Sequence, residues 1–77
     1  MDKATQKAKI LGYCVEYGSI TIREAFERLN INSPSKRISE MRLSGRYDVQ
    51  AEVEERIKDG GDVVRYKRYF ITARGEA

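Results

Sequence analysis

The chain has 77 residues, of which 40% are hydrophobic and 35% are charged, and its formal net charge is +3 at pH 7. This length fits one small domain, so we treat residues 1–77 as a single folded unit. One cysteine and no histidine exclude an intramolecular disulfide and the usual zinc-ligand sets, and we expect neither metal nor cofactor. Without an apolar run of signal-peptide or membrane-spanning length, we expect a cytoplasmic protein that does not bind membranes.

Apolar residues recur at helical spacing near the start of the chain and predict an amphipathic helix over residues 3–17. The residues of this stripe are Ala4, Ala8, Leu11 and Val15, widened by Ile10, Cys14 and Tyr17. Gly18 is expected to end the helix, because glycine readily adopts the positive φ of a helix C-terminus. We therefore expect the stripe to face the core.

A second helix is predicted over residues 22–29, after a very short extended segment. Thr21 and Glu24 have the spacing of a capping box, in which each side chain binds the backbone N–H of the other residue. Ile20, just before this box, is placed to pack on Ala25 as a hydrophobic staple.

A third helix is predicted over residues 34–44. Ser33 is its expected N-cap, Pro34 suits the first helical position, and Gly45 is expected to end the helix. Ile38 and Met41 lie about one turn apart, so we expect both to point into the core.

After Gly45 the hydrophobic period changes to two, which predicts a β-hairpin with strands over residues 47–58 and 63–72. The apolar residues that share one face of the first strand are Tyr47, Val49, Ala51, Val53 and Ile57. The connecting sequence Asp59-Gly60-Gly61-Asp62 is typical of a tight turn. In the second strand we expect one face, with Tyr69 and Ile71, to pack under the helices, and the other, with Tyr66 and Phe70, to be partly exposed.

These elements predict an α+β fold: a three-helix winged helix-turn-helix with a C-terminal β-hairpin wing. The chain resembles winged helix-turn-helix proteins common in phages, prophages and mobile elements. The segments that carry the resemblance are Ile10-Leu11, Gly18–Thr21, Glu24-Ala25, Ile31, Arg37–Arg42 and Tyr66–Ile71. The resemblance implies a repressor, an excision factor or a protein adaptor. Leu43 departs from it, because this position is usually polar in a helix that reads DNA.

The third helix is the expected reading helix, because the segment from Ser33 to Arg46 has a net charge of +3. Its candidate nucleic-acid contacts are Ser33, Ser35, Lys36, Arg37, Ser39, Arg42 and Arg46. Helical periodicity predicts that Lys36, Ser39, Glu40 and Leu43 point most directly away from the core. The alternative is a solvated helix face with an ion pair between Arg37 and Glu24.

The second strand of the wing is basic, and Arg65, Lys67 and Arg68 are its candidate phosphate contacts, with Arg56 and Lys58 near the tip. The alternative is that these bases pair across the hairpin with the acidic residues of the first strand, which are Glu52, Glu54 and Glu55. The sequence leaves both alternatives open.

Catalysis has little support, because the chain lacks histidine and the adjacent Glu54 and Glu55 point to opposite faces of a strand. We therefore expect a protein that is not an enzyme and has no small-molecule substrate. The favoured function is sequence-specific binding of double-stranded DNA, as a transcriptional regulator or a recombination or excision factor of a mobile element. The alternative is an adaptor or inhibitor that binds a protein partner through its acidic strand and exposed Leu43, Tyr66 or Phe70. Dimerisation with a second copy stays open.

Overall fold

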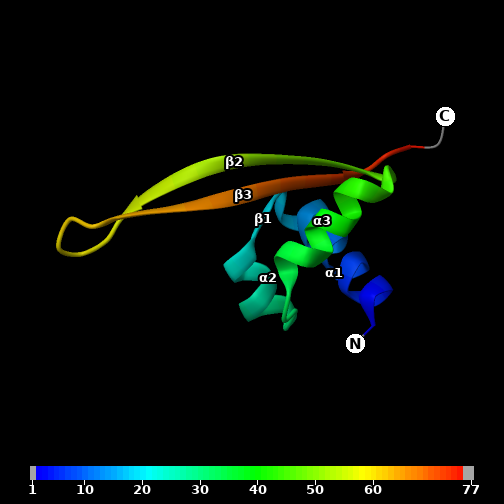
Figure 1. Ribbon diagram of the computed structural model, residues 1–77, viewed down its shortest axis with the longest axis horizontal. Coiled ribbons are helices and arrows are strands. Elements are labelled where there is room, and N and C mark those ends of the chain that lie inside the picture. Colours follow the sequence, from blue (N-terminus) through cyan, green and yellow to red (C-terminus); the bar gives the residue numbers. More distant parts are fainter. Residues whose placement is uncertain (1, 76–77) are drawn as a thin grey trace.

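The computed structural model describes residues 2–75 and has the predicted order of elements (Figure 1). In chain order the elements are α1 (Lys3–Tyr17), β1 (Ile20–Thr21), α2 (Ile22–Leu29), α3 (Pro34–Ser44), β2 (Tyr47–Ile57) and β3 (Val63–Ala73). The helices form one body, and the β2–β3 hairpin lies across it and projects well beyond it. This arrangement confirms the predicted α+β winged helix-turn-helix fold.

Local signals set most helix ends as predicted. The Thr21 side chain accepts a hydrogen bond from Glu24 N at 3.1 Å, and the Glu24 carboxylate accepts one from Thr21 N at 2.9 Å, so the capping box is present. Gly18 and Gly45 have φ values of 90° and 73°, a region that residues with a Cβ rarely adopt. The sequence reasoning missed the N-cap of α1, where Asp2 accepts a hydrogen bond from Thr5 N at 2.7 Å.

Ser33 differs from the prediction. It occupies the N-cap position of α3, but its side chain makes no capping hydrogen bond. Its backbone, with φ of −132° and ψ of 67°, lies outside the extended conformation usual for an N-cap. The start of α3 therefore rests on Pro34, which is buried at the first turn, rather than on a side-chain cap.

The sheet is antiparallel, with strand order β1-β3-β2. β1 pairs only at Ile20 with Tyr69 and at Thr21 with Arg68, whereas β2 and β3 pair along their whole length. The first wing strand ends at Ile57, so Lys58 belongs to the turn, where its backbone N–H donates to Asp62 O at 2.8 Å. Most of the wing is therefore a two-stranded ribbon.

The core lies where the helices meet the inner end of the sheet. Its buried residues are Ile10, Tyr13, Cys14, Ile20, Ala25, Ile31, Ile38, Met41 and Ile71. Ile38 and Met41 are 2% and 0% exposed, which confirms the predicted inward side of α3. Ile20 and Ala25, the proposed staple pair, both belong to this cluster.

The predicted inward face of α1 is correct for Ile10 and Cys14 but wrong for four of its other residues. Val15 is 76% exposed, and Ala4, Ala8 and Tyr17 are also exposed. The helix buries Ile10 and Cys14, which belonged to the predicted stripe, and Tyr13, which did not, with Leu11 partly buried against the core. Alanine has little apolar surface to bury, so the larger side chains decide which side of the helix faces inward.

The alternating face of β2 is only partly covered. Tyr47 and Val49 pack against the core, but Val53 and Ile57 are 64% and 74% exposed, because the ribbon extends beyond the helices. The two faces of β3 behave as predicted, since Ile71 and Tyr69 contact the core and the opposite face leaves Tyr66 and Phe70 partly exposed.

Candidate nucleic-acid interface

The helix-turn-helix is formed by α2, α3 and the short connection between them. Asn30 ends α2 in the left-handed conformation with φ of 56°, and Ile31 N donates to Ala25 O at 3.3 Å. The Ile31 side chain is fully buried, which ties the connection to the core. Together with Ile38 and Met41 it holds α3 with one side inward and the opposite side in solvent.

The solvent side of α3 contains five of the residues singled out from the sequence. At about 100° per residue, the side opposite Ile38 and Met41 is centred close to Leu43. Lys36, Ser39 and Leu43 are exposed there, and Ser35 and Arg42 are exposed on the flanks of this side. Within residues 2–75, Lys36 and Arg42 form no ion pair, so their charges are available to a ligand.

Arg37 is not part of this surface, which corrects the prediction. Its side chain is 6% exposed, and its guanidinium Nη2 lies 3.2 Å from Glu40 Oε2. The predicted alternative, an ion pair between Arg37 and Glu24, is also wrong, because Glu24 pairs with Arg68. Arg37 Nε is buried and has no hydrogen-bond partner among the described residues, so Arg37 contributes to the interior and not to a reading face.

Glu40 is likewise displaced from the predicted outward stripe. It is partly buried at the contact of α3 with α1, where Lys7 Nζ lies 3.3 Å from Glu40 Oε1. Burial acts to raise the pKa of Glu40, but Lys7, Arg37 and Lys3 outweigh it and hold that pKa below its ordinary value. The one acidic residue of α3 therefore faces cations of the protein, and the solvent side of the helix carries basic and polar side chains together with the exposed Leu43.

Arg46 follows the C-terminal glycine of α3 and is exposed. Its backbone N–H donates to Ser44 Oγ at 3.2 Å, and its carbonyl accepts from Arg74 N at 2.9 Å, so its backbone is fixed. No side-chain partner of Arg46 occurs in the described part of the chain, which leaves its guanidinium directed to solvent.

The wing neutralises two of its three candidate phosphate contacts. Arg65 Nε binds Glu55 Oε1 at 2.9 Å, and Arg68 Nε binds Glu54 Oε1 at 2.8 Å. These pairs match the cross-strand alternative raised from the sequence. Lys67 is exposed and has no ion-pair partner within residues 2–75, so it is the one of the three whose charge is free.

Arg68 also joins the wing to the helical body. Its Nη1 lies 3.2 Å from Ser19 Oγ and 3.4 Å from Glu24 Oε1, the same carboxylate oxygen that accepts from Thr21 N. Arg68 also holds the pKa of Glu54 below its ordinary value by hydrogen bonding to the carboxylate, and Glu54 in return raises the pKa of Arg68. Arg68 is therefore a positioning residue that fixes the wing against the start of α2.

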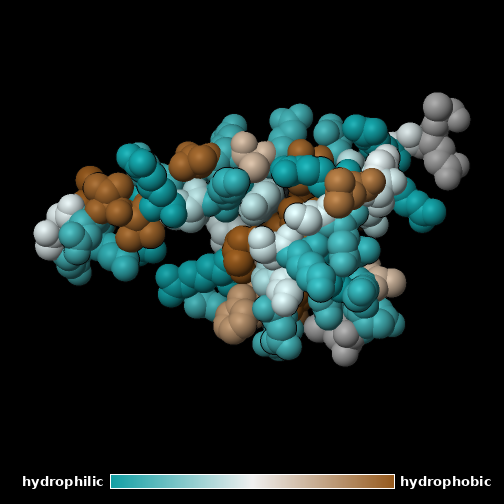
Figure 2. Space-filling view, in the orientation of Figure 1, coloured by the Kyte–Doolittle hydropathy of each residue, from teal (hydrophilic) through white to brown (hydrophobic). Residues whose placement is uncertain are grey.

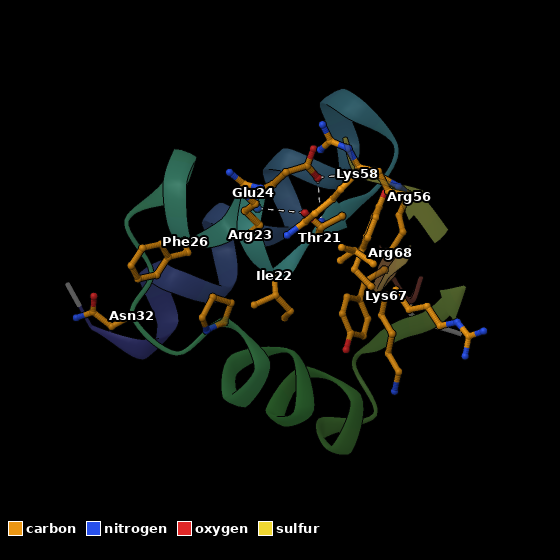
Figure 3. A pocket seen from close by; sticks show the side chains of 15 residues that line it. Thr21, Ile22, Arg23, Glu24, Phe26, Asn32, Arg56, Lys58, Lys67 and Arg68 are labelled. Carbon is orange, nitrogen blue, oxygen red and sulfur yellow. Dashed lines mark hydrogen bonds and ion pairs between the residues drawn. The ribbon is translucent and has the colours of Figure 1, made fainter. Parts of the chain in front are cut away.

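An open groove of about 1040 Å³ lies between the wing and the helix-turn-helix (Figure 3). In the close-up Ile22 lies near the middle, with Phe26 and Asn32 toward one end and Lys67 and Arg68 toward the other. The basic residues that line it are Arg23, Arg56, Lys58, Arg65, Lys67 and Arg68. Arg23 was missed from the sequence; its position in the first turn of α2, between Thr21 and Glu24 of the capping box, was the available signal.

Comparison with known families matches residues 5–74 to the winged helix-turn-helix domain. Because the match covers most of the chain, this protein belongs to that family. No curated protein and no solved structure matches it. Winged helix-turn-helix domains are in general DNA-binding domains without catalytic activity, so membership indicates DNA binding in this broad sense.

Within residues 2–75 no helix is long and apolar enough to cross a membrane. The same residues hold no cluster of three or more histidine, cysteine or acidic side chains suited to a metal ion.

Proposed function

We propose that this chain binds double-stranded DNA in a sequence-specific way, as a cytoplasmic regulator of transcription or an accessory factor in recombination or excision of a mobile element. The observation that carries the proposal is the unpaired basic charge on the solvent side of α3, contributed by Lys36 and Arg42 and continued by Arg46. Such a surface suits a polyanion, and a helix has the width to enter the major groove.

In this proposal the residues of α3 have separate roles. Lys36 and Arg42 hydrogen-bond guanine edges or neutralise phosphates, and Ser39 lies between them on the base-reading side. Ser33 and Ser35, at the start of the helix, hydrogen-bond a phosphate, since neither hydroxyl has a hydrogen-bond partner within residues 2–75. Arg37 is left out, because it is buried.

In this proposal the phosphate backbone of the DNA lies along the groove beside the wing. Arg56, Lys58 and Lys67 line it and have no ion-pair partner within the described chain. Arg65 and Arg68 are also on its wall, but their charges are already paired. Of the wing residues predicted from the sequence, backbone contact therefore depends on Arg56, Lys58 and Lys67 rather than on Arg65 and Arg68.

One such domain covers only about 600–1,000 Å² of DNA-facing surface, which is small for tight binding. We therefore propose that two copies act on one target, as a homodimer or on tandem sites. Sedimentation with and without duplex DNA measures this directly, and a single copy bound tightly to one site would contradict it.

Fluorescence polarisation with a labelled mixed-sequence duplex tests the function itself. If about 4 to 6 phosphates are neutralised, the logarithm of the binding constant falls against the logarithm of salt concentration with a slope near −4 to −5. The variant Lys36→Ala removes one of the free charges of α3. Lys9→Ala is its matched control, because it removes the same charge from an exposed position on α1. Absence of duplex binding at about 50 mM salt would sink this proposal, since electrostatic binding is strongest at low salt.

A second function, binding of a protein partner, is favoured by the far part of the wing. Val53, Ile57 and Val63 lie on one face of the ribbon and are at least half exposed, and Figure 2 shows apolar surface at this end of the molecule. Glu52 adds unpaired acidic charge on the other face. Loss of a captured protein on Val53→Ser with Ile57→Ser, with DNA binding unchanged, would support this function.

A further inference from the structure

Leu43 is the most exposed of the large hydrophobic residues in the described chain, with 86% of its surface accessible. Figure 2 shows apolar surface over the C-terminal end of α3, within otherwise hydrophilic surroundings. The helical period places this side chain opposite the midpoint of Ile38 and Met41, at the centre of the solvent side. It therefore points where the proposed function places the floor of the major groove.

Leu43 is not needed for the fold. It belongs neither to the buried core nor to the partly buried residues that pack against it. A leucine in water gains free energy when a ligand covers it with an apolar group, whereas contact with a polar group leaves that group without a hydrogen-bond partner. The ligand atom that meets Leu43 is therefore expected to be carbon.

The floor of the major groove offers one methyl group, the 5-methyl of thymine; cytosine has only a C–H at the same position, and the other exposed groups are hydrogen-bond donors and acceptors. Resting on the proposed function, we propose that Leu43 is a specificity-determining residue that packs against a thymine methyl group. Base pairs without a methyl group at this position bind more weakly, because Leu43 cannot hydrogen-bond to their donors and acceptors.

The spacing of α3 places this thymine relative to a second contact. Leu43 follows Lys36 by seven residues, which is about 10.5 Å along the helix axis at 1.5 Å per residue. This length corresponds to about three base-pair steps of 3.4 Å. Lysine prefers guanine, so the target is expected to contain guanine and thymine about three base pairs apart.

The test starts from the duplex that the wild-type chain selects from a random library. Each thymine is then replaced by deoxyuridine, which removes only the methyl group, and affinity is measured for wild type, Leu43→Ala and Leu43→Met. One replacement is expected to weaken wild-type binding about fourfold, the effect of one buried methyl-sized group. Leu43→Ala should bind both duplexes alike, and Leu43→Met should keep the discrimination.

Folding does not confuse this test, because truncation of an exposed side chain should leave the thermal midpoint of Leu43→Ala unchanged. The proposal is overturned if no deoxyuridine replacement weakens wild-type binding, or if Leu43→Ala discriminates as wild type does. In each of these two outcomes the wild-type chain still binds duplex DNA. Failure of the proposed function is a different result, in which the library yields no bound duplex even at low salt.

Discussion

The helix α3 and the strand β3 are both basic in sequence, but only the helix leaves most of its cations without an ion-pair partner among the described residues. Lys36 and Arg42 have no ion-pair partner within residues 2–75, whereas Arg65 and Arg68 are bound to Glu55 and Glu54. The antiparallel register sets an acidic strand beside a basic one, and the single acidic residue of α3 faces α1. The net charge of a segment therefore overestimates the charge available to a polyanion wherever a complementary strand lies beside it.

The largest expected effect is a loss of stability when the core under α3 and β3 is changed. Ile38→Ala should lower the free energy of unfolding by about 2–5 kcal/mol, because it leaves a cavity under α3. Leu43→Ala, a truncation of similar size on the solvent side of the same helix, is the control and should change stability little. Denaturant titration measures both. Equal stability of the two variants would mean that the assigned inward side of α3 is wrong.

Next in size is the contrast between a free and a paired cation. Lys36→Ala should weaken DNA binding by about 1–3 kcal/mol if Lys36 contacts a guanine, whereas Arg65→Ala should change affinity by less than about twofold, because Glu55 already neutralises it. Polarisation titrations at one salt concentration compare them. Equal losses for the two variants would remove the distinction between helix and wing.

A smaller effect on DNA affinity is expected when the bond between Arg68 and Glu54 is removed. Glu54→Gln removes a charge and frees one bond of Arg68, so it should raise DNA affinity by about two- to threefold through reduced repulsion of phosphates. Glu52→Gln removes the same charge from an exposed position of the same strand without breaking that bond. A rise with Glu52→Gln that equals the rise with Glu54→Gln would mean that pairing of Arg68 does not limit binding.

The smallest effect concerns acid stability. The pKa values of Glu40 and Glu54 are lowered in the folded chain, so their contribution to stability is present above their ordinary value of 4.5 and is lost as pH falls through the folded pKa values. Thermal midpoints recorded below pH 5 should therefore decline less steeply for Glu54→Gln than for wild type. Parallel curves for the two proteins would show that the pair with Arg68 does not contribute.

Much of the fold could be predicted from the sequence, because its signals are local. The Thr21 and Glu24 capping box, the glycines at 18 and 45 and the change of hydrophobic period after α3 each depend on residues close in the chain. The same locality explains why Ile38 and Met41 were assigned to the core. The inward side of the first helix was harder to predict. Its alanines and Val15 form a regular apolar stripe, but they are less buried in the folded chain than Ile10 and Tyr13.

The order and ends of the helices, the hairpin and the inward side of α3 could be predicted from the sequence, because they depend on residues close in the chain. Which charges are free depends instead on contacts between elements. Arg37 was buried, Glu40 was paired with Lys7 of α1, Arg68 was bound by Ser19, Glu24 and Glu54, and Leu43 was left in solvent. The reason is physical: a charge is neutralised by whichever group lies within a few ångströms, and those groups come from other elements of the chain.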